Sequence, residues 1–192
     1  MYNTAMIKDA GNLAKGMYVL YRGAPNLIVK TEFMNPGKGS AIMRVKYKNP
    51  ETGAASEFTY KTSDRVEIVE VEKKVMQFLY ADPSEAFFMD PKTYDQVSVK
   101  ASLMEGQTEY LLPNMECYIL FYQNRAIGVL IPPHVRLKVI EAGEAVAGST
   151  VNGAKKTVKL ETGIEVAVPL FIKSGETILV DTVTGEYLSR AN

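Results

Sequence analysis

The stretch TEFMNPGKGSAIMRVK, residues 31–46, places a turn rich in Pro and Gly between two runs, the second of which alternates apolar and polar residues. The second run extends to residue 48 and alternates three apolar with three basic residues: Met43, Val45 and Tyr47 with Arg44, Lys46 and Lys48. A period of two is that of a strand with one buried face. The stretch therefore predicts a hairpin of strands Leu27–Phe33 and Ile42–Lys48, with a basic outer face on the second.

Short segments of the same kind, separated by Gly, Pro and Asn turns, run along the whole chain. They predict strands at Met17–Tyr21, Glu57–Tyr60, Val66–Val71, Val75–Tyr80, Ala86–Met89, Cys117–Tyr122, Ala126–Ile131, Val135–Ile140, Thr157–Leu160, Glu165–Val168 and Ile178–Asp181. One short helix is expected at about Pro91–Val99, because Pro91 suits a first helical turn. Many short strands with such turns are typical of all-β barrels or sandwiches.

Two features divide the 192 residues into three pieces. The sign of the charge changes near Arg65–Glu67, and Pro132-Pro133 cannot lie within a central strand. We therefore expect domains at 1–66, 67–130 and 131–192, each long enough for a small five-stranded barrel. Domains of this size bury little surface and are expected to support one another at their junctions.

The net charge of zero hides an uneven distribution along the chain. Residues 1–66 contain 10 Lys and Arg against 5 Asp and Glu, residues 67–130 contain 5 against 10, and residues 131–192 contain 7 against 7. The first piece thus suits an anionic partner, and the second either avoids anions or meets a basic partner. With no long apolar run, no signal-like N-terminus and a single cysteine, the sequence predicts a cytoplasmic protein with no membrane partner.

Residues for catalysis or metal binding are scarce. Cys117 is the one cysteine and lies in an apolar run, where a free cysteine acts as a small buried hydrophobe. His134 is the one histidine, so neither a metal site nor a cofactor is expected. The glycines of Gly143–Thr150 have the spacing of a phosphate-binding loop, but the lysine before the hydroxyl residue is missing. The segment Asn35–Ser40 fails the same pattern, because glycine follows Lys38 and Glu32 stands where the first glycine of the loop would be.

The predicted hairpin tip is the most unusual feature. Pro36 restricts the backbone, while Gly37 and Gly39 allow angles closed to other residues, so Lys38 stands between neighbours without side chains. Such a lysine can enter a narrow space. Beside it, the basic strand face is what contact with phosphate groups requires.

Residues 31–46 resemble the lysine-bearing loop of the bacterial elongation factor P family, and residues 160–182 with 185–190 resemble its third-domain signature. Shorter matches are Phe78–Asp82, Phe88–Asp90 and Ile131–Pro133. The sequence departs from the family pattern at Asn35, Arg136, Lys138, Val183 and the segment Gly143–Lys156. The resemblance nevertheless spans nearly the whole chain, in order.

The resemblance implies an SH3-like (KOW-like) barrel followed by two OB-type barrels, in an L shape. It also implies a monomeric, non-enzymatic factor that binds the ribosome between the peptidyl and exit sites, contacting rRNA and peptidyl-tRNA, and relieves stalling at consecutive prolines. Lys38, supported by Pro36, Gly37 and Gly39, is then the group that reaches the CCA end of the tRNA and the target of a lysine-modifying enzyme.

The remaining site residues follow from the same resemblance. Arg44, Lys46 and Lys48 are expected near the acceptor arm, and Tyr187 and Arg190 toward the small subunit and the anticodon arm. The alternative is a divergent paralogue or a general OB-type RNA-binding protein, which would stack bases on exposed aromatic rings. Tyr118, Phe121 and Tyr122 are the candidates for that platform.

Overall fold

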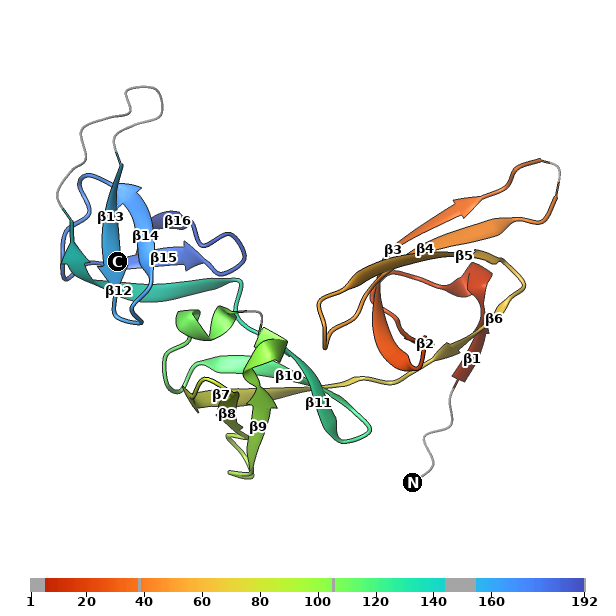
Figure 1. Ribbon diagram of the computed structural model, residues 1–192, viewed down its shortest axis with the longest axis horizontal. Helices are drawn as coiled ribbons and strands as arrows, with labels where there is room; N and C mark the ends of the chain where they lie inside the picture. Colours follow the sequence, from red (N-terminus) through yellow and green to blue (C-terminus); the bar gives the residue numbers. More distant parts are fainter. Residues whose placement is uncertain (1–5, 38, 105, 144–154, 192) are drawn as a thin grey trace. The chain divides into compact units, whose positions relative to one another are not determined.

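A computed structural model describes residues 6–37, 39–104, 106–143 and 155–191 (Figure 1). In these residues the regular structure is β-strand, apart from three short 3-10 turns: η1 (Ala10–Asn12), η2 (Ala101–Met104) and η3 (Gln107–Tyr110). The strands form three separate sheets. The predicted all-β fold is therefore confirmed.

The first sheet has six strands in the order β1-β6-β2-β3-β4-β5. These are β1 (Met6–Asp9), β2 (Tyr18–Tyr21), β3 (Ala24–Met34), β4 (Ile42–Lys48), β5 (Ala55–Lys61) and β6 (Arg65–Ile68). Strands β3 and β4 pair antiparallel, with Thr31 opposite Val45 and Phe33 opposite Met43. The hairpin predicted around residues 31–46 is thus present.

The apolar residues of β4 are the centre of the first core. Val45 and Tyr47 are fully buried and Met43 nearly so, whereas Lys46 and Lys48 are exposed, as the period of two requires. The Tyr47 ring stacks on Tyr21 at a centroid distance of 4.7 Å. Its hydroxyl donates to the Tyr60 hydroxyl at 2.8 Å. A polar group inside the core is thereby hydrogen-bonded.

The second sheet has five strands in the order β11-β10-β7-β8-β9. These are β7 (Glu72–Ala81), β8 (Glu85–Met89), β9 (Gln96–Lys100), β10 (Glu116–Tyr122) and β11 (Arg125–Leu130). Phe78 and Phe88 meet edge to face in its core, 5.6 Å apart. Cys117 is buried beside this core, as expected for a small hydrophobe.

The helix expected at about Pro91–Val99 does not form; the segment is a closed turn followed by β9. The Asp90 carboxylate accepts hydrogen bonds from the backbone of Lys92 at 2.7 Å and Thr93 at 3.3 Å. Tyr94 then adopts a φ of 63°, which ends any helical path. Side-chain bonding to a local turn competes with the helix, and the following residues pair with β8.

The third sheet has five strands in the order β14-β13-β12-β15-β16. These are β12 (His134–Ala142), β13 (Lys155–Leu160), β14 (Glu165–Pro169), β15 (Thr177–Asp181) and β16 (Tyr187–Ala191). Leu137, Leu160, Ile172 and Ile178 are fully buried in its core. Tyr110, Leu112, Met115, Ile164 and Tyr187 pack against that core.

The sheets fall close to the predicted segments 1–66, 67–130 and 131–192, with β6 extending to Ile68. By its contacts the chain divides differently, into residues 1–74 with 118–129 and residues 75–117 with 130–192. The domain boundaries therefore stay a prediction. In the described ranges no helix is long and apolar enough to cross a membrane.

The buried tyrosine pair predicts how the first sheet responds to alkali. Burial is the main factor that raises the pKa of both Tyr47 and Tyr60. An unfolded chain loses the Tyr47 proton at about pH 10, whereas the folded sheet retains it. The free energy of unfolding is therefore at its full value below about pH 10 and falls as the pH rises further.

Urea unfolding of the wild type, Tyr47→Phe and Tyr94→Phe on both sides of about pH 10 measures this loss. Tyr94 is 71% exposed, so Tyr94→Phe should follow the wild type. Tyr47→Phe should be destabilised by about 0.5–1.5 kcal/mol at neutral pH and should lose less stability in alkali. An alkaline loss as steep in Tyr47→Phe as in the wild type would contradict the assignment.

Candidate nucleic-acid interface

The lysine hairpin, meaning β3, β4 and residues 35–41 between them, has a tip built on two glycines. Gly37 has a φ of 71° and Gly39 a φ of 112°, both in the range that residues with a Cβ rarely adopt. A Cβ at either position would meet nothing within 4 Å. Backbone conformation, and not lack of space, is therefore what requires glycine there. Lys38, between them, lies outside the described residues.

The described part of the tip is exposed to solvent. Asn35, Pro36, Gly37, Gly39 and Ser40 all have exposed surfaces. The proline ring fixes the φ of Pro36, which limits the freedom of the chain as it enters the turn. The hairpin thus ends in a restrained, solvent-exposed loop.

Below the tip, the structure brings the predicted basic residues onto one face. Arg44, Lys46 and Lys48 alternate with the buried residues of β4 and point away from the core. Lys30 of β3 lies directly opposite Lys46 and adds a further cation to this face. The resulting basic face, defined as Lys30, Arg44, Lys46 and Lys48, contains the strand face predicted from sequence and adds Lys30 to it.

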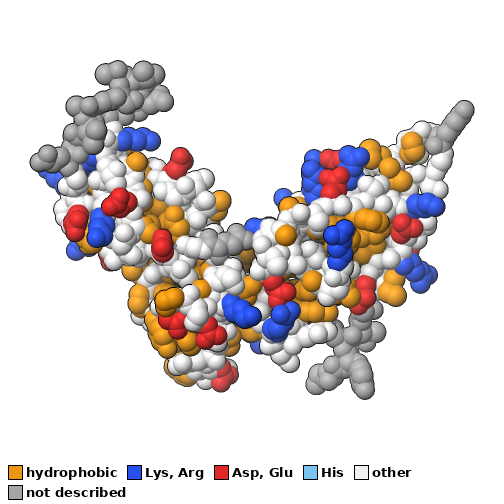
Figure 2. All heavy atoms as spheres, in the orientation of Figure 1, with side chains coloured by type: hydrophobic (Ala, Val, Ile, Leu, Met, Phe, Trp, Pro, Cys, Tyr) orange, Lys and Arg blue, Asp and Glu red, His pale blue; other side chains and the backbone are white. Residues whose placement is uncertain are grey.

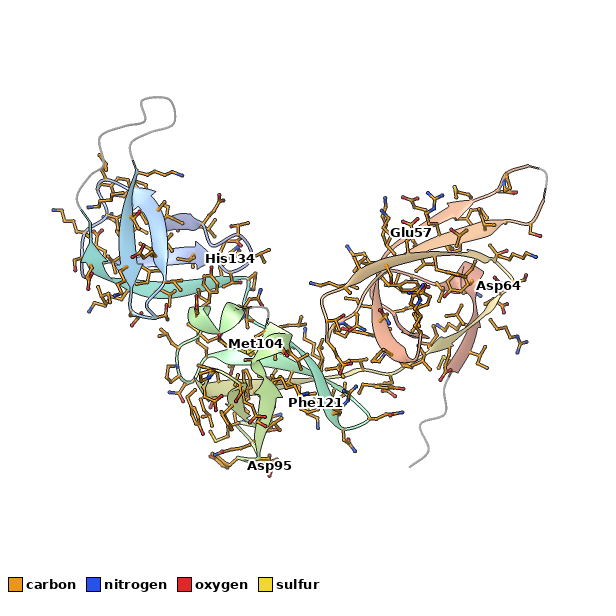
Figure 3. The ribbon with its side chains drawn as sticks, in the orientation of Figure 1. Glu57, Asp64, Asp95, Met104, Phe121 and His134 are labelled. Carbon is orange, nitrogen blue, oxygen red and sulfur yellow. The ribbon has the colours of Figure 1, made fainter. Side chains whose placement is uncertain are left out.

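Two carboxylates sit within the basic face, and sequence reasoning did not anticipate their effect. Glu32 of β3 pairs with Lys30 and lies 3.8 Å from the Arg44 guanidinium. Glu57 of β5 lies 3.4 Å from Arg44 Nε and 3.5 Å from Lys46 Nζ. Figure 3 labels Glu57, and Figure 2 shows acidic side chains among basic ones over the first sheet.

These ion pairs leave much less charge than the sequence suggests. Lys30, Arg44 and Lys46 supply three positive charges and Glu32 and Glu57 two negative ones, so the network has a net charge of +1. The hydrogen bond and charge of Lys30 lower the pKa of the Glu32 carboxyl, which stays ionised at neutral pH. The register was the missing signal, because Glu32 lies opposite Arg44 and Glu57 opposite Lys46.

The two predicted site residues of β16, Tyr187 and Arg190, make contacts within the third sheet. Tyr187 is half-buried and packs against the core of that sheet. The Arg190 guanidinium lies 3.4 Å from Glu176 Oε1, with its side chain about half exposed at 52%. An arginine so placed can still contact an anion.

The aromatic residues of β10 are poorly suited to stacking with bases. Lys73 Nζ lies 3.8 Å from the centre of the Tyr118 ring, and Lys74 Nζ lies 5.3 Å from that of Phe121. Each ammonium occupies a ring face in a cation–π contact. A base that stacked there would have to displace a lysine.

The described residues offer little chemistry for an enzyme or a metal site. Burial raises the pKa of the Cys117 thiol to about 12, so the nucleophilic thiolate is not formed at neutral pH. His134 begins β12 with Nε2 at 3.8 Å from the Asp181 carboxylate. In the described ranges no group of three His, Cys, Asp or Glu could hold a metal ion. The phosphate-loop spacing at Gly143–Thr150 lies, apart from Gly143, outside those ranges.

Sequence models of known families match three consecutive parts of the chain. They are the elongation factor P KOW-like domain at residues 9–66, the elongation factor P OB domain at 71–129 and the elongation factor P C-terminal domain at 135–190. An elongation factor P from Desulfatibacillum aliphaticivorans is 42% identical over 182 residues, which is 95% of this chain and 97% of that protein. This chain belongs to the elongation factor P family.

Other comparisons agree with that membership. An elongation factor P from Acidithiobacillus ferrooxidans is 44% identical and aligns over 85% of this chain and 88% of its own. A solved structure, eukaryotic translation initiation factor 5A from Methanococcus jannaschii, matches 67% of this chain and 98% of that one, with a TM-score of 0.52 and 27% identity. The elongation factor P resemblance predicted from residues 31–46 and 160–190 is therefore confirmed.

A second solved structure supports the fold alone. It is a translation initiation factor 5A family protein from Naegleria fowleri, with a TM-score of 0.51 and 17% identity. It covers 66% of this chain and 99% of that one.

The ion pairs predict that removing a carboxylate strengthens binding to nucleic acid. Glu32→Gln removes the carboxylate that pairs with Lys30 and one of the two carboxylates near Arg44. One more cation can then pair with a phosphate. Affinity for a tRNA should rise, and the slope of log affinity against log salt should steepen by about one phosphate contact. Filter binding at several salt concentrations measures both quantities.

The matched control is Glu85→Gln, because Glu85 lies on β8 of the second sheet and outside the basic face. It changes the net charge by the same amount without altering the hairpin. If Glu85→Gln raised the affinity as much as Glu32→Gln, the gain would reflect overall charge and not the basic face.

Proposed function

We propose that this elongation factor P family protein binds the ribosome beside the peptidyl-tRNA and relieves stalling at consecutive prolines. The observation that supports it best is the hairpin tip, where glycines with φ of 71° and 112° flank Lys38 on both sides. Neighbours without side chains let a lysine enter a narrow channel, as the peptidyl-transferase centre demands. The protein acts as a monomer, and its partners are the ribosome, rRNA and peptidyl-tRNA.

The proposed mechanism is positional. Proline is a bulky nucleophile, and consecutive prolines hold the reacting groups away from the attack geometry. Lys38 contacts the CCA end of the peptidyl-tRNA and restores that geometry. Correct placement can lower a barrier by several kcal/mol without acid or base catalysis. The protein then needs no catalytic residue of its own.

The remaining site residues take supporting roles. Pro36, Gly37 and Gly39 hold the tip, and Arg44, Lys46 and Lys48 face the phosphates of the acceptor arm. Tyr187 and Arg190 lie toward the small subunit and the anticodon arm. A lysine-modifying enzyme lengthens Lys38, which increases its reach and adds hydrogen-bond donors.

Synthesis of a triple-proline peptide on reconstituted ribosomes tests the proposal. The wild type should accelerate the step, and Lys38→Ala should lose most of the effect, roughly 10²-fold by the cost of a misplaced reacting group. Lys38→Arg should also lose activity while keeping its affinity for RNA, because it retains the charge. Lys92→Ala, which removes an exposed lysine of the second sheet's loop region, is the matched control.

Two outcomes of this assay would contradict the proposal. If recombinant wild type gives no acceleration, the assay is repeated with protein from the native host, whose Lys38 is modified there. A second failure would leave a general RNA-binding protein, and equal activity of Lys38→Ala and the wild type would remove Lys38 from the mechanism.

A further inference from the structure

The turn between β4 and β5 lies at the other end of β4 from the lysine tip, and it is tightly built. The Asn49 carboxamide oxygen accepts hydrogen bonds from the backbone of Glu51 at 2.8 Å and Thr52 at 3.1 Å. The Asn49 backbone N–H donates a hydrogen bond to the Ala54 carbonyl, and the Gly53 N–H donates one to the Asn49 carbonyl, each at 2.9 Å. With Gly53 at a φ of 69°, the turn is closed on itself. These bonds give the turn one closed conformation at the end of β4.

This turn rests on β11, within the compact unit formed by residues 1–74 and 118–129. A Cβ at Gly128 would lie 3.4 Å from Pro50 Cβ, 3.4 Å from Leu120 Cδ1 and 3.6 Å from the Pro50 carbonyl oxygen. Gly128 is buried in the middle of β11 and has no positive φ. A glycine at such a strand position marks the close approach of another segment of backbone.

An ion pair borders the same contact. Arg125, at the start of β11, lies with its guanidinium 2.7 Å from the Glu51 carboxylate, which is largely shielded at 22% exposure. Arg125 itself is 65% exposed, so the pair contributes little to the free energy of unfolding. Its effect is to orient the turn on β11. The turn thus has an apolar support at Gly128 and a charged one at Arg125.

Because β4 is long, a small rotation of the hairpin about this contact would displace the tip by a large distance. Its seven residues span about 23 Å at about 3.3 Å per residue. A rotation of about 10° over that length moves the far end by about 4 Å. A displacement of only about 1 Å in a positioning group can cost about 10²-fold in rate.

We propose that Pro50, Glu51, Arg125 and Gly128 form a docking seat that aims the lysine hairpin. They are positioning residues for the reaction that Lys38 assists, and the inference rests on the proposed function. The seat acts through β4, because none of its members belongs to the hairpin tip.

A designed disulfide tests the seat without reference to activity. The Pro50→Cys/Gly128→Cys pair would place its Cβ atoms about 3.4 Å apart, close to the mean of about 3.8 Å in disulfides. Mild oxidation of the purified full chain should form this bond in most molecules, detected by mass spectrometry after non-reducing digestion. Pro50→Cys alone, with the native buried Cys117, is the control and should form none. Failure of the pair to cross-link would overturn the proposal.

The cross-linked protein also reports on the working state. In triple-proline synthesis without reductant, the oxidised pair should stimulate within two-fold of its reduced form, because the bond preserves the seat. Loss of stimulation on oxidation, regained on reduction, would show that the seat must open during function and would overturn the proposal.

Substitutions in the seat give the kinetic test. Gly128→Ile pushes against Pro50 and should lower stimulation at saturating factor at least ten-fold, while Gly128→Ala adds an ordinary contact and should cost less than two-fold. The ribosome affinity of both should stay within about three-fold of the wild type, since the seat aims a group and does not bind one. Because Gly128→Ile also presses on Leu120, thermal unfolding of both variants is measured in parallel.

The Arg125–Glu51 ion pair supplies a further test, because Arg125 is 65% exposed and its substitution leaves the apolar core unchanged. Arg125→Glu places two carboxylates together and should lower stimulation about three- to five-fold, and Glu51→Arg/Arg125→Glu should restore it. Lys92→Glu, with the same change of charge outside the seat, should match the wild type. Equal activity of Arg125→Glu and the wild type, or no recovery in the double variant, counts against the seat. A wild type that is inactive even when purified from the native host would instead reject the proposed function.

Discussion

The burial of Met43, Val45 and Tyr47 on one face of β4 is the constraint on which the first sheet and its site depend. Because a strand alternates its side chains, burying these three forces Arg44, Lys46 and Lys48 to the opposite face. The same packing sets the register with β3, so the tip must lie at residues 35–41. A slip of one residue would turn the cations inward, and the hydrophobic face is what prevents it.

Charge on that outer face is balanced more closely than a strong RNA-binding surface requires. Glu32 and Glu57 hold Arg44 between them, at 3.8 and 3.4 Å. Exposed ion pairs of this kind contribute about 1 kcal/mol or less, so phosphate groups can replace the carboxylates at small cost. The network lowers the net charge of this face and with it the attraction to phosphate groups of any sequence.

Glycine is needed for different physical reasons at the two ends of β4, the tip of the lysine hairpin and the docking seat. At the tip, glycine is needed because the backbone adopts positive φ in open space. At the seat, Gly128 lies in ordinary strand geometry, and its lack of a side chain matters because Pro50 approaches closely. Both kinds of glycine look alike in a sequence. Their distinct roles become visible only when the backbone angle and the neighbouring atoms are known.

The sequence by itself determined the all-β class, most strands, the hairpin and the elongation factor P family, because alternation and turn residues are local and the motifs are contiguous. It failed where local preferences competed: at Pro91–Val99, the Asp90 turn replaced the expected helix. Strands β1, β9 and β16 were missed, since β1 and β16 in particular have few buried residues to set a period. Only the tertiary structure decided the pairing of Arg44 with Glu57 and the contact of Pro50 with Gly128. The first depends on the register of β4 with β5, and the second joins the turn after β4 of the first sheet to β11 of the second. The periodicity along one strand cannot encode which atoms of another strand it meets.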